Sequence, residues 1–491
     1  MTNTPLNLHH LIDGEWVTGT GGTSRSTNPA TPDEVVGTYL TATTVELDAA
    51  LVAAIAAKTA WDRLGVLARG LILRKAAGLL EQRAEQIAVL MTREQGKILA
   101  DARAEIGGTV ETLYYHASAA RRPAGITYPS GNPDEIVRSV RRPVGVVGII
   151  TPWNFPLQIP AWKIAPALMW GNTVVWKTAS DTPAVAVALA EIFVEAGVPA
   201  GVLNLLIGPG SLGAELVADR RVDAVTFTGS VPVGHQIRES VIGRGARLQM
   251  ELGGHNPALV LPDADIPAAA TFITAAAMGS TGQKCTATRR VIAVGTAYEQ
   301  VKEELIQRVS ALRVGPGLRE GVQIGPLVSA RARDEVADAI ERAIKEGATV
   351  LAQAELPQDD TGAYVAPTLL EGDSSLSIAS EEVFGPVTLL MRVADLAAAI
   401  ELANATDFGL TASVFTRDET VVRRCLDEVD AGLIKINGPS TGSEVHAPFG
   451  GVKQSSFPAP REQGSDAVAE FFSVLKTAYL RALPNETGAV Q

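Results

Sequence analysis

Short apolar, β-branched runs alternate with helical segments from residue 144 onward, and this alternation limits the possible fold more than any other feature. Unbroken apolar runs are typical of parallel strands that are buried on both faces. The runs form two consecutive series, the first at 144–150, 172–176, 202–207 and 224–228, and the second at 258–261, 291–294, 388–392, 411–415 and 432–436. Helical segments such as 183–196 and 211–218 separate them. This order predicts an α/β fold with two doubly wound parallel-sheet domains and a cleft between them.

The two ends of the chain do not follow this alternation. Residues 46–120 carry apolar side chains at helical spacing and are predicted to form helices. Residues 136–140 alternate like an exposed strand, and residues 471–480 alternate like a strand that belongs to neither series. The chain of 491 residues is too long for one ordinary core, which agrees with two large domains.

Charge and cysteine content exclude several classes of protein. The net charge is −12, and an acidic surface repels phosphate groups, so we expect no nucleic-acid partner and no binding to an anionic membrane. The longest apolar runs are interrupted, and residues 1–10 lack the pattern of a signal peptide. Only two cysteines are present, which excludes a disulfide scaffold and favours a reducing cytoplasm. We also expect no metal site.

Cys285 is the candidate nucleophile. It follows a helical run, 266–280, and lies in a turn that begins at Gly282. A thiol in such a turn can lie near backbone amides, and the adjacent Lys284 adds positive charge that favours the thiolate. The alternative is a buried, inert cysteine, which is the commoner fate of a lone thiol. For Cys425, within a predicted helix, the inert role is preferred.

Glu251 is the candidate base. None of the six histidines lies in a protease-like setting, so a Cys–His hydrolase is disfavoured. Glu251 ends the apolar run 248–252, just before Gly253 and Gly254. A carboxylate at a strand end can face a cleft and be partly desolvated, which raises its pKa towards that of a useful base. A salt-bridged or helix-capping glutamate is the alternative.

Two glycine-rich turns and one proline-bounded turn are candidates for ligand contact. Residues 208–213 match GxGxxG between a strand and a helix, although no acidic ribose ligand follows at the expected distance. Residues 227–230 form a similar turn, whose helix N-terminus can hold a pyrophosphate. In residues 152–156, the amide of Asn154 can donate to an oxyanion, and Lys177, after the next strand, can reach ribose hydroxyls. Each of these features also has a purely structural explanation as a turn or a solvated lysine.

Taken together and in order, these pieces resemble the aldehyde dehydrogenase superfamily. The resemblance covers nearly the whole chain, from about Leu11 to Leu480. The matching segments are 152–156 (PWNFP), 171–175 (GNTVV), 227–230 (FTGS), 251–254 (ELGG), 282–285 (GQKC), 381–386 (EEVFGP) and 448–451 (PFGG).

The resemblance implies a role for each candidate residue. Cys285 attacks the aldehyde, Asn154 holds the oxyanion, and Glu251 activates the water that hydrolyses the thioester. The cofactor is NAD or NADP. The residues implied to contact it are Ile150, Thr151, Pro152, Trp153, Lys177, Ser180, Gly210, Gly229, Ser230, Val233, Leu252, Glu382 and Phe384. The residues implied to line the aldehyde tunnel are Gln158, Lys284 and Phe449.

The resemblance also implies a domain organisation. A Rossmann-like cofactor domain would comprise residues 1–121 and 142–252, and a catalytic domain would comprise residues 253–455. A small β oligomerisation flap would comprise residues 122–141 and 468–486, in a homodimer or homotetramer.

Within the superfamily, the segments 159–168, 282–288 and 461–464 are most similar to those of α-ketoglutaric semialdehyde (2,5-dioxopentanoate) dehydrogenases. Two departures from the common pattern stand out. Ser180 occupies a position where many NAD-preferring members carry glutamate, which leaves the choice between NAD and NADP open. Residues 456–460 (SFPAP) replace the usual glycine-containing turn before Arg461.

Three other functions compete with this interpretation. A CoA-acylating enzyme would not need the base Glu251, and a hydrolase without net redox chemistry would not need the nucleotide-side turns. A catalytically silent protein on the same fold should have lost Cys285, Glu251 or Asn154, and all three are present. Members with another substrate range, such as succinic semialdehyde or aliphatic or aromatic aldehydes, remain the main alternative.

Overall fold

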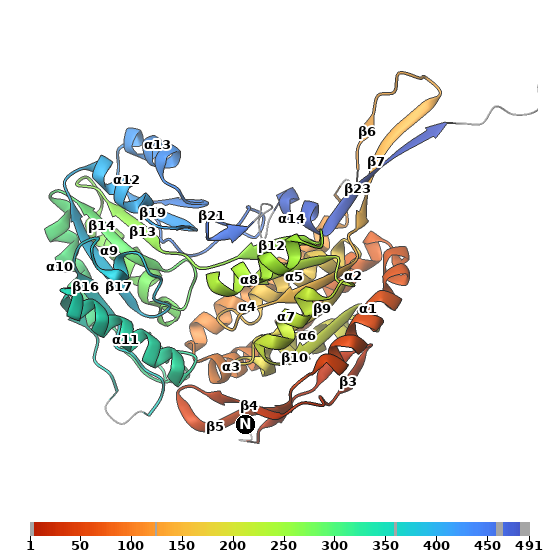
Figure 1. Ribbon diagram of the computed structural model, residues 1–491. Coiled ribbons are helices and arrows are strands. Elements are labelled where there is room, and N and C mark those ends of the chain that lie inside the picture. Colours follow the sequence, from red (N-terminus) through yellow and green to blue (C-terminus); the bar gives the residue numbers. More distant parts are fainter. Residues whose placement is uncertain (1–3, 123–124, 358–360, 458–464, 482–491) are drawn as a thin grey trace, which may run out of the picture.

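Two large sheets form the body of the protein in the computed structural model (Figure 1), which describes residues 4–122, 125–357, 361–457 and 465–481. The eight-stranded sheet has the order β22-β12-β11-β8-β9-β10-β2-β3, and the seven-stranded sheet has the order β15-β16-β17-β14-β13-β19-β20. This confirms the predicted α/β fold class. The residues 458–460 and 461–464, on which part of the sequence comparison rested, lie outside the described residues.

The eight-stranded sheet is parallel in its centre and antiparallel at both edges. Its strands are β2 (His10–Ile12), β3 (Glu15–Val17), β8 (Val146–Ile150), β9 (Thr173–Thr178), β10 (Leu203–Ile207), β11 (Ala224–Thr228), β12 (Arg247–Glu251) and β22 (Ser456–Phe457). The helices of this half are α1 (Thr44–Leu64), α2 (Val66–Gln82), α3 (Ala84–Gln95), α4 (Leu99–Ala119), α5 (Gln158–Met169), α6 (Pro183–Ala196), α7 (Gly210–Ala218), α8 (Val231–Ile242) and α14 (Ser465–Phe472).

The seven-stranded sheet has one antiparallel edge strand, β15. Its strands are β13 (Asn256–Val260), β14 (Thr288–Val294), β15 (Thr349–Gln353), β16 (Thr368–Glu371), β17 (Val387–Val393), β19 (Thr411–Phe415) and β20 (Leu433–Ile436). Its helices are α9 (Ile266–Met278), α10 (Ala297–Ser310), α11 (Ala330–Glu346), α12 (Leu396–Asn404) and α13 (Glu419–Glu428), with short 3₁₀ turns at Gly279–Gly282 and Ser377–Ala379.

Three smaller sheets complete the part of the chain that the structure describes. The antiparallel sheet β23-β7-β6 projects away from the body (Figure 1). The small sheets consist of β6 (Thr127–Tyr128), β7 (Glu135–Pro143) and β23 (Ser473–Arg481); β1 (Leu6–Asn7), β4 (Thr23–Asn28) and β5 (Thr31–Leu40); and β18 (Phe408–Gly409) and β21 (Val452–Lys453).

Burial on both faces explains why the central strands lack an alternating pattern. In β8, Val147 packs into one core and its neighbour Val146 into the core on the opposite face. In β9, Val174 and Val175 likewise pack into the cores on opposite faces of the sheet. Successive residues of a strand point to opposite faces, so a strand between two helical layers is apolar throughout.

Candidate active site

One cavity of about 730 Å³ collects most of the residues singled out in the sequence. Its wall includes the turns that follow the carboxyl ends of β8, β11 and β12, which is where parallel sheets place their ligands. The opposite wall comes from α11, from Cys285 before β14, and from the segment before β17. The cavity therefore lies between residues of the two large sheets.

Cys285 lines this cavity and is half-buried. The preceding Gly282 has a φ of +66°, and a Cβ there would lie 2.0 Å from the carbonyl oxygen of Gly385, so only glycine fits. The buried guanidinium of Arg289 donates to the carbonyl oxygens of Gly282 (2.7 Å), Lys284 (3.2 Å) and Gly385 (2.8 Å). Arg289 thus fixes the backbone of the cysteine turn, and no sequence pattern indicates this role.

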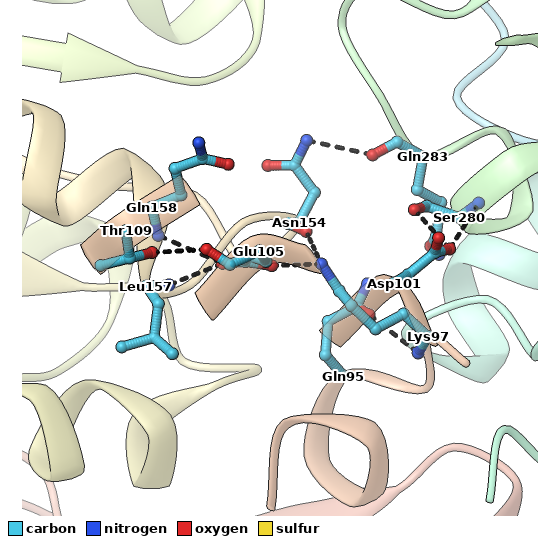
Figure 2. Close-up of polar contacts among 10 residues, drawn as sticks. All are labelled: Gln95, Lys97, Asp101, Glu105, Thr109, Asn154, Leu157, Gln158, Ser280 and Gln283. Atoms are coloured by element: carbon cyan, nitrogen blue, oxygen red, sulfur yellow. Dashed lines mark hydrogen bonds and ion pairs between the residues drawn. The ribbon is translucent and has the colours of Figure 1, made fainter. Parts of the chain in front are cut away.

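Asn154 also lines the cavity, and its side chain is buried. The amide Nδ2 donates to the carbonyl oxygen of Gln283 at 3.0 Å, so the asparagine reaches the turn that carries Cys285 (Figure 2). Its backbone carbonyl oxygen accepts a hydrogen bond from Lys97 Nζ at 2.7 Å. The proposed oxyanion donor is therefore held at its side chain and at its backbone.

Glu251 is the last residue of β12 and is buried. Ser456, opposite it on the antiparallel strand β22, donates its Oγ hydrogen to Glu251 Oε1 at 2.5 Å. Glu251 itself is not in the cavity wall, but the next two residues, Leu252 and Gly253, are. The departure from the family pattern at Ser456 therefore contacts the candidate base directly.

Glu382 and Phe384 lie on the cavity wall where the sequence comparison implies a nicotinamide riboside. Burial raises the pKa of Glu382, and the neighbouring Arg289 opposes that shift. Glu382 Oε1 accepts the backbone amide of Gly254 at 3.0 Å, which leaves carboxylate lone pairs available for hydroxyl donors. The ring of Phe384 meets Trp153 edge to face at 5.7 Å.

The predicted cofactor residues divide into two groups. Those in the cavity wall are Pro152, Trp153, Gly229, Ser230, Leu252, Glu382 and Phe384, and those outside it are Ile150, Thr151, Lys177, Ser180, Gly210 and Val233. Thr151 Oγ1 accepts a hydrogen bond from the indole of Trp176 at 2.9 Å, and Ser180 Oγ donates to the carbonyl oxygen of Gly208 at 3.0 Å.

Lys177, in the last part of β9, is buried, and burial lowers the pKa of its ammonium to about 8. Asp181 lies close enough to oppose this shift. Burial raises the pKa of Asp181 in turn, while Arg331 and Lys177 lower it.

The three predicted substrate residues do not line the cavity. Phe449 packs against Trp162 at 5.3 Å, within an apolar cluster that Cys285 contacts. Burial lowers the pKa of Lys284, and the charge that most opposes the shift belongs to Asp101. Gln158 begins α5 and is half-buried. The structure thus places an apolar cluster beside the Cys285 thiol. It places the Lys284 ammonium close to the carboxylate of Asp101.

The hydrogen-bond donors and acceptors in the cavity wall suit a dinucleotide. Thr228 to Pro232 line it, and α8 begins there without a side-chain cap among the described residues, so the amides of its first turn other than that of Pro232, which has no N–H, can meet phosphate oxygens. Glu382 provides an acceptor for ribose hydroxyls on the opposite wall.

Within the described residues, no helix is both long and apolar enough to span a membrane.

Comparison with known proteins agrees with this geometry. The aldehyde dehydrogenase family model matches residues 16–477. The chain is 44% identical over 485 residues to the α-ketoglutaric semialdehyde dehydrogenase of Bacillus subtilis (strain 168), covering 98% of each protein. An NADP-dependent enzyme of E. coli has a TM-score of 0.92 at 35% identity, covering 97% of this chain and 98% of that one. Betaine aldehyde dehydrogenase from Staphylococcus aureus in complex with NAD+ has a TM-score of 0.93 at 32% identity, covering 98% and 96%.

Proposed function

The chain belongs to the aldehyde dehydrogenase family, and we propose that it oxidises a short aldehyde with a remote carboxylate to the corresponding acid. α-Ketoglutaric semialdehyde is the favoured substrate, in agreement with the name of the Bacillus subtilis relative. The cofactor is NAD or NADP, as in the related solved structures. The observation that carries the proposal is the single cavity whose wall holds Cys285, Asn154 and Glu382 together.

The chemistry follows from the roles of three side chains. The Cys285 sulfur attacks the aldehyde carbon, and the resulting thiohemiacetal oxyanion accepts a hydrogen bond from the Asn154 amide. When bound in the cavity, the nicotinamide cofactor would supply the acceptor for the hydride that leaves this carbon, so that a thioester would remain on Cys285. Glu251 then takes a proton from water, whose oxygen attacks the thioester carbonyl. The carboxylate product leaves, and the Cys285 thiolate is restored.

The substrate class is tested by comparing kcat/KM for four aldehydes. α-Ketoglutaric semialdehyde and succinic semialdehyde should exceed hexanal and benzaldehyde by about 10–100-fold, because a buried carboxylate needs a charge-assisted partner. Lys284 is the proposed partner of the substrate carboxylate, and Gln158 and Phe449 are the other proposed substrate contacts, although none of the three lines the cavity of about 730 Å³. Lys284→Met should remove most of this preference.

Lys345→Met is the matched control, because Lys345 is an exposed lysine on α11, paired with Glu341 at 3.4 Å. It should leave the four kcat/KM values unchanged. A clear preference for hexanal or benzaldehyde would refute the anionic substrate. A preference for the two semialdehydes that persists in Lys284→Met would instead show that Lys284 does not pair with the substrate carboxylate.

We predict that the enzyme accepts NADP at a useful rate. Ser180 carries no charge at a position where a glutamate would repel a 2′-phosphate, and Lys177 can pair with the phosphate. Ser180→Glu should therefore weaken NADP binding by about 10–100-fold and change NAD binding by less than about threefold. The measurement is the Kd of each reduced cofactor by fluorescence titration.

The pKa of Lys177 adds a pH dependence to this prediction. Since burial lowers that pKa to about 8, the charge is present below about pH 8 and is lost as the pH rises through this value. The affinity for NADP relative to NAD should therefore fall between about pH 7 and about pH 9. Wild-type binding of NADP weaker than that of NAD by roughly 4 kcal/mol or more would show that the argument from Ser180 is wrong.

We further propose the domain organisation that the family resemblance implies. Residues 1–121 and 142–252 would bind the cofactor, residues 253–455 would form the catalytic domain, and residues 122–141 and 468–486 would form the oligomerisation flap. Exposed apolar side chains on β7 and β23 support a flap that pairs with another subunit: Ile136 is 57%, Leu475 57% and Tyr479 68% exposed. A homodimer or homotetramer in the cytoplasm fits these features and the two unpaired cysteines.

A further inference from the structure

A fully buried ion pair lies behind the oxyanion turn. Lys97 Nζ is 2.5 Å from Glu105 Oε2, and the two side chains are 1% and 0% exposed. Neither residue lines the cavity, and neither is among the site residues predicted from the sequence. Burying two charges costs several kcal/mol per ion unless further hydrogen bonds satisfy them, so the remaining partners of this pair indicate what it does.

Each member of the pair holds one end of the segment from Asn154 to Gln158 (Figure 2). Lys97 Nζ donates to the backbone carbonyl oxygen of Asn154 at 2.7 Å. Glu105 Oε1 accepts the backbone amides of Leu157 (2.9 Å) and Gln158 (3.2 Å) at the start of α5. Because α5 has no side-chain cap of its own, the Glu105 carboxylate satisfies its first amides and opposes its dipole.

The local backbone explains how Lys97 reaches this position. Helix α3 ends at Gly96, whose φ is +96°, and a Cβ there would lie 2.7 Å from Pro29 Cγ. The chain reverses at this left-handed residue and re-enters a helix at Leu99, which leaves Lys97 pointing inward. Its ammonium also lies 4.4 Å from the ring centroid of Phe155, the residue after Asn154.

Helix α4, which carries Glu105, also contacts the turn that leads to Cys285. Asp101, one turn before Glu105 on α4, accepts the backbone amide (3.1 Å) and the hydroxyl (2.8 Å) of Ser280. Ser280 has a φ of +52°, so the carboxylate holds a strained backbone in the turn that continues to Gln283. Helix α4 therefore contacts the segment that carries Asn154 and the segment whose Gln283 carbonyl oxygen orients the Asn154 amide.

We propose that Lys97 and Glu105 are positioning residues for the Asn154 amide, an inference that rests on the proposed oxyanion role of Asn154. The amide has two N–H groups, and the Gln283 carbonyl occupies one of them. The other must meet the oxyanion within a hydrogen-bond distance of about 2.7–3.1 Å, and a displacement of about 1 Å costs roughly 100-fold in rate. By fixing the main chain on both sides of Phe155, the ion pair fixes that geometry before substrate binds.

The test removes both charges together, because a single change would leave an unpaired buried ion. In the full-length enzyme, Lys97→Met/Glu105→Gln should lower the pre-steady-state burst rate of reduced cofactor by about 10–100-fold. Binding of the cofactor should change by less than about twofold, and alkylation of Cys285 by iodoacetamide, which needs no oxyanion, by less than about threefold. A burst rate equal to that of the wild type would overturn the inference.

A double-mutant cycle with Asn154→Ala separates positioning from a general structural effect. If the pair acts through Asn154, adding the Lys97 and Glu105 changes to Asn154→Ala should cost less than about twofold more. A loss that adds in full would overturn the inference and leave the oxyanion role standing. A normal burst rate in Asn154→Ala alone would overturn the oxyanion role, and the inference with it.

Two further variants keep the test decisive. Lys97→Arg retains the charge but moves the donor atoms, so it should show a smaller loss with the same non-additivity even if the double variant does not fold. Glu85→Gln/Arg103→Met is the matched control, because this ion pair joins α3 to the same helix α4 with side chains 63% and 55% exposed. A loss of burst rate in this control as large as that in Lys97→Arg would also overturn the inference.

Discussion

Replacement of Cys285 by alanine should lower kcat by at least about 10⁴-fold, because no thiohemiacetal can form without the sulfur. Cys285 is half-buried at the cavity wall, so removing its sulfur should not disturb the core. The groups proposed to hold the cofactor, Glu382 and the N-terminus of α8, remain in place. Cofactor affinity should therefore stay near that of the wild type. The measurements are single-turnover formation of reduced cofactor and fluorescence titration of the bound cofactor.

Cys425→Ala is the control for this experiment. Cys425 lies in α13 and packs into a core of the seven-stranded sheet, and burial raises the pKa of its thiol. It should be slow to alkylate, and its replacement should leave kcat within about twofold. Substantial turnover by Cys285→Ala would remove Cys285 from the mechanism. Loss of turnover in Cys425→Ala with the fold intact would show that Cys425 also takes part.

The parallel strands and the helices between them were predictable because their signal is local. Each central strand is buried on both faces, so it reads as one apolar run, and Gly or Pro marks where it ends. Helix α6, predicted at 183–196, has those bounds in the structure, since Pro183 opens it and the left-handed Gly197 closes it. The four helices α1 to α4 confirm the helical prediction for residues 46–120.

The short edge strands could not be predicted in the same way. Strands β2, β3 and β22 have two or three residues each, too few for a pattern to develop. Strand β22 exists because it pairs with β12, far away in the sequence, and that pairing brings Ser456 to Glu251. No property of Ser456 alone indicates this contact.

The charged residues that support the site were also invisible in the sequence. A lysine in a Gly–Lys pair or a glutamate within a helix normally faces solvent, so Lys97 and Glu105 carry no sign of burial. Arg289 is likewise buried only because the carbonyl groups of two separate turns converge on it. The residues that line the cavity were easier to identify, since they follow strand ends or resemble family segments.

Replacement of Glu251 by glutamine should slow thioester hydrolysis by about 10²–10⁴-fold, because a neutral amide cannot accept a proton from water. The change preserves shape, and the Ser456 hydroxyl can still donate to the remaining carbonyl oxygen at this position. Attack by Cys285 and the subsequent oxidation do not require that proton transfer. We therefore expect a normal burst of reduced cofactor, about one per active site, followed by slow turnover.

Ser456→Ala distinguishes the proton transfer by Glu251 from the hydrogen bond that holds the Glu251 carboxylate. Removing this hydroxyl takes away the hydrogen bond to Glu251 Oε1 but leaves the carboxylate able to accept a proton. We expect a loss in the hydrolytic step of about 10–100-fold at most, with the burst unchanged, since a hydrogen bond to a charged group contributes roughly 1.5–3 kcal/mol. Accumulated thioester should be detectable on Cys285 by mass spectrometry after acid quenching of Glu251→Gln. Loss of the burst in Glu251→Gln, with cofactor still bound, would show that Glu251 acts before the thioester forms, for example by deprotonating the Cys285 thiol.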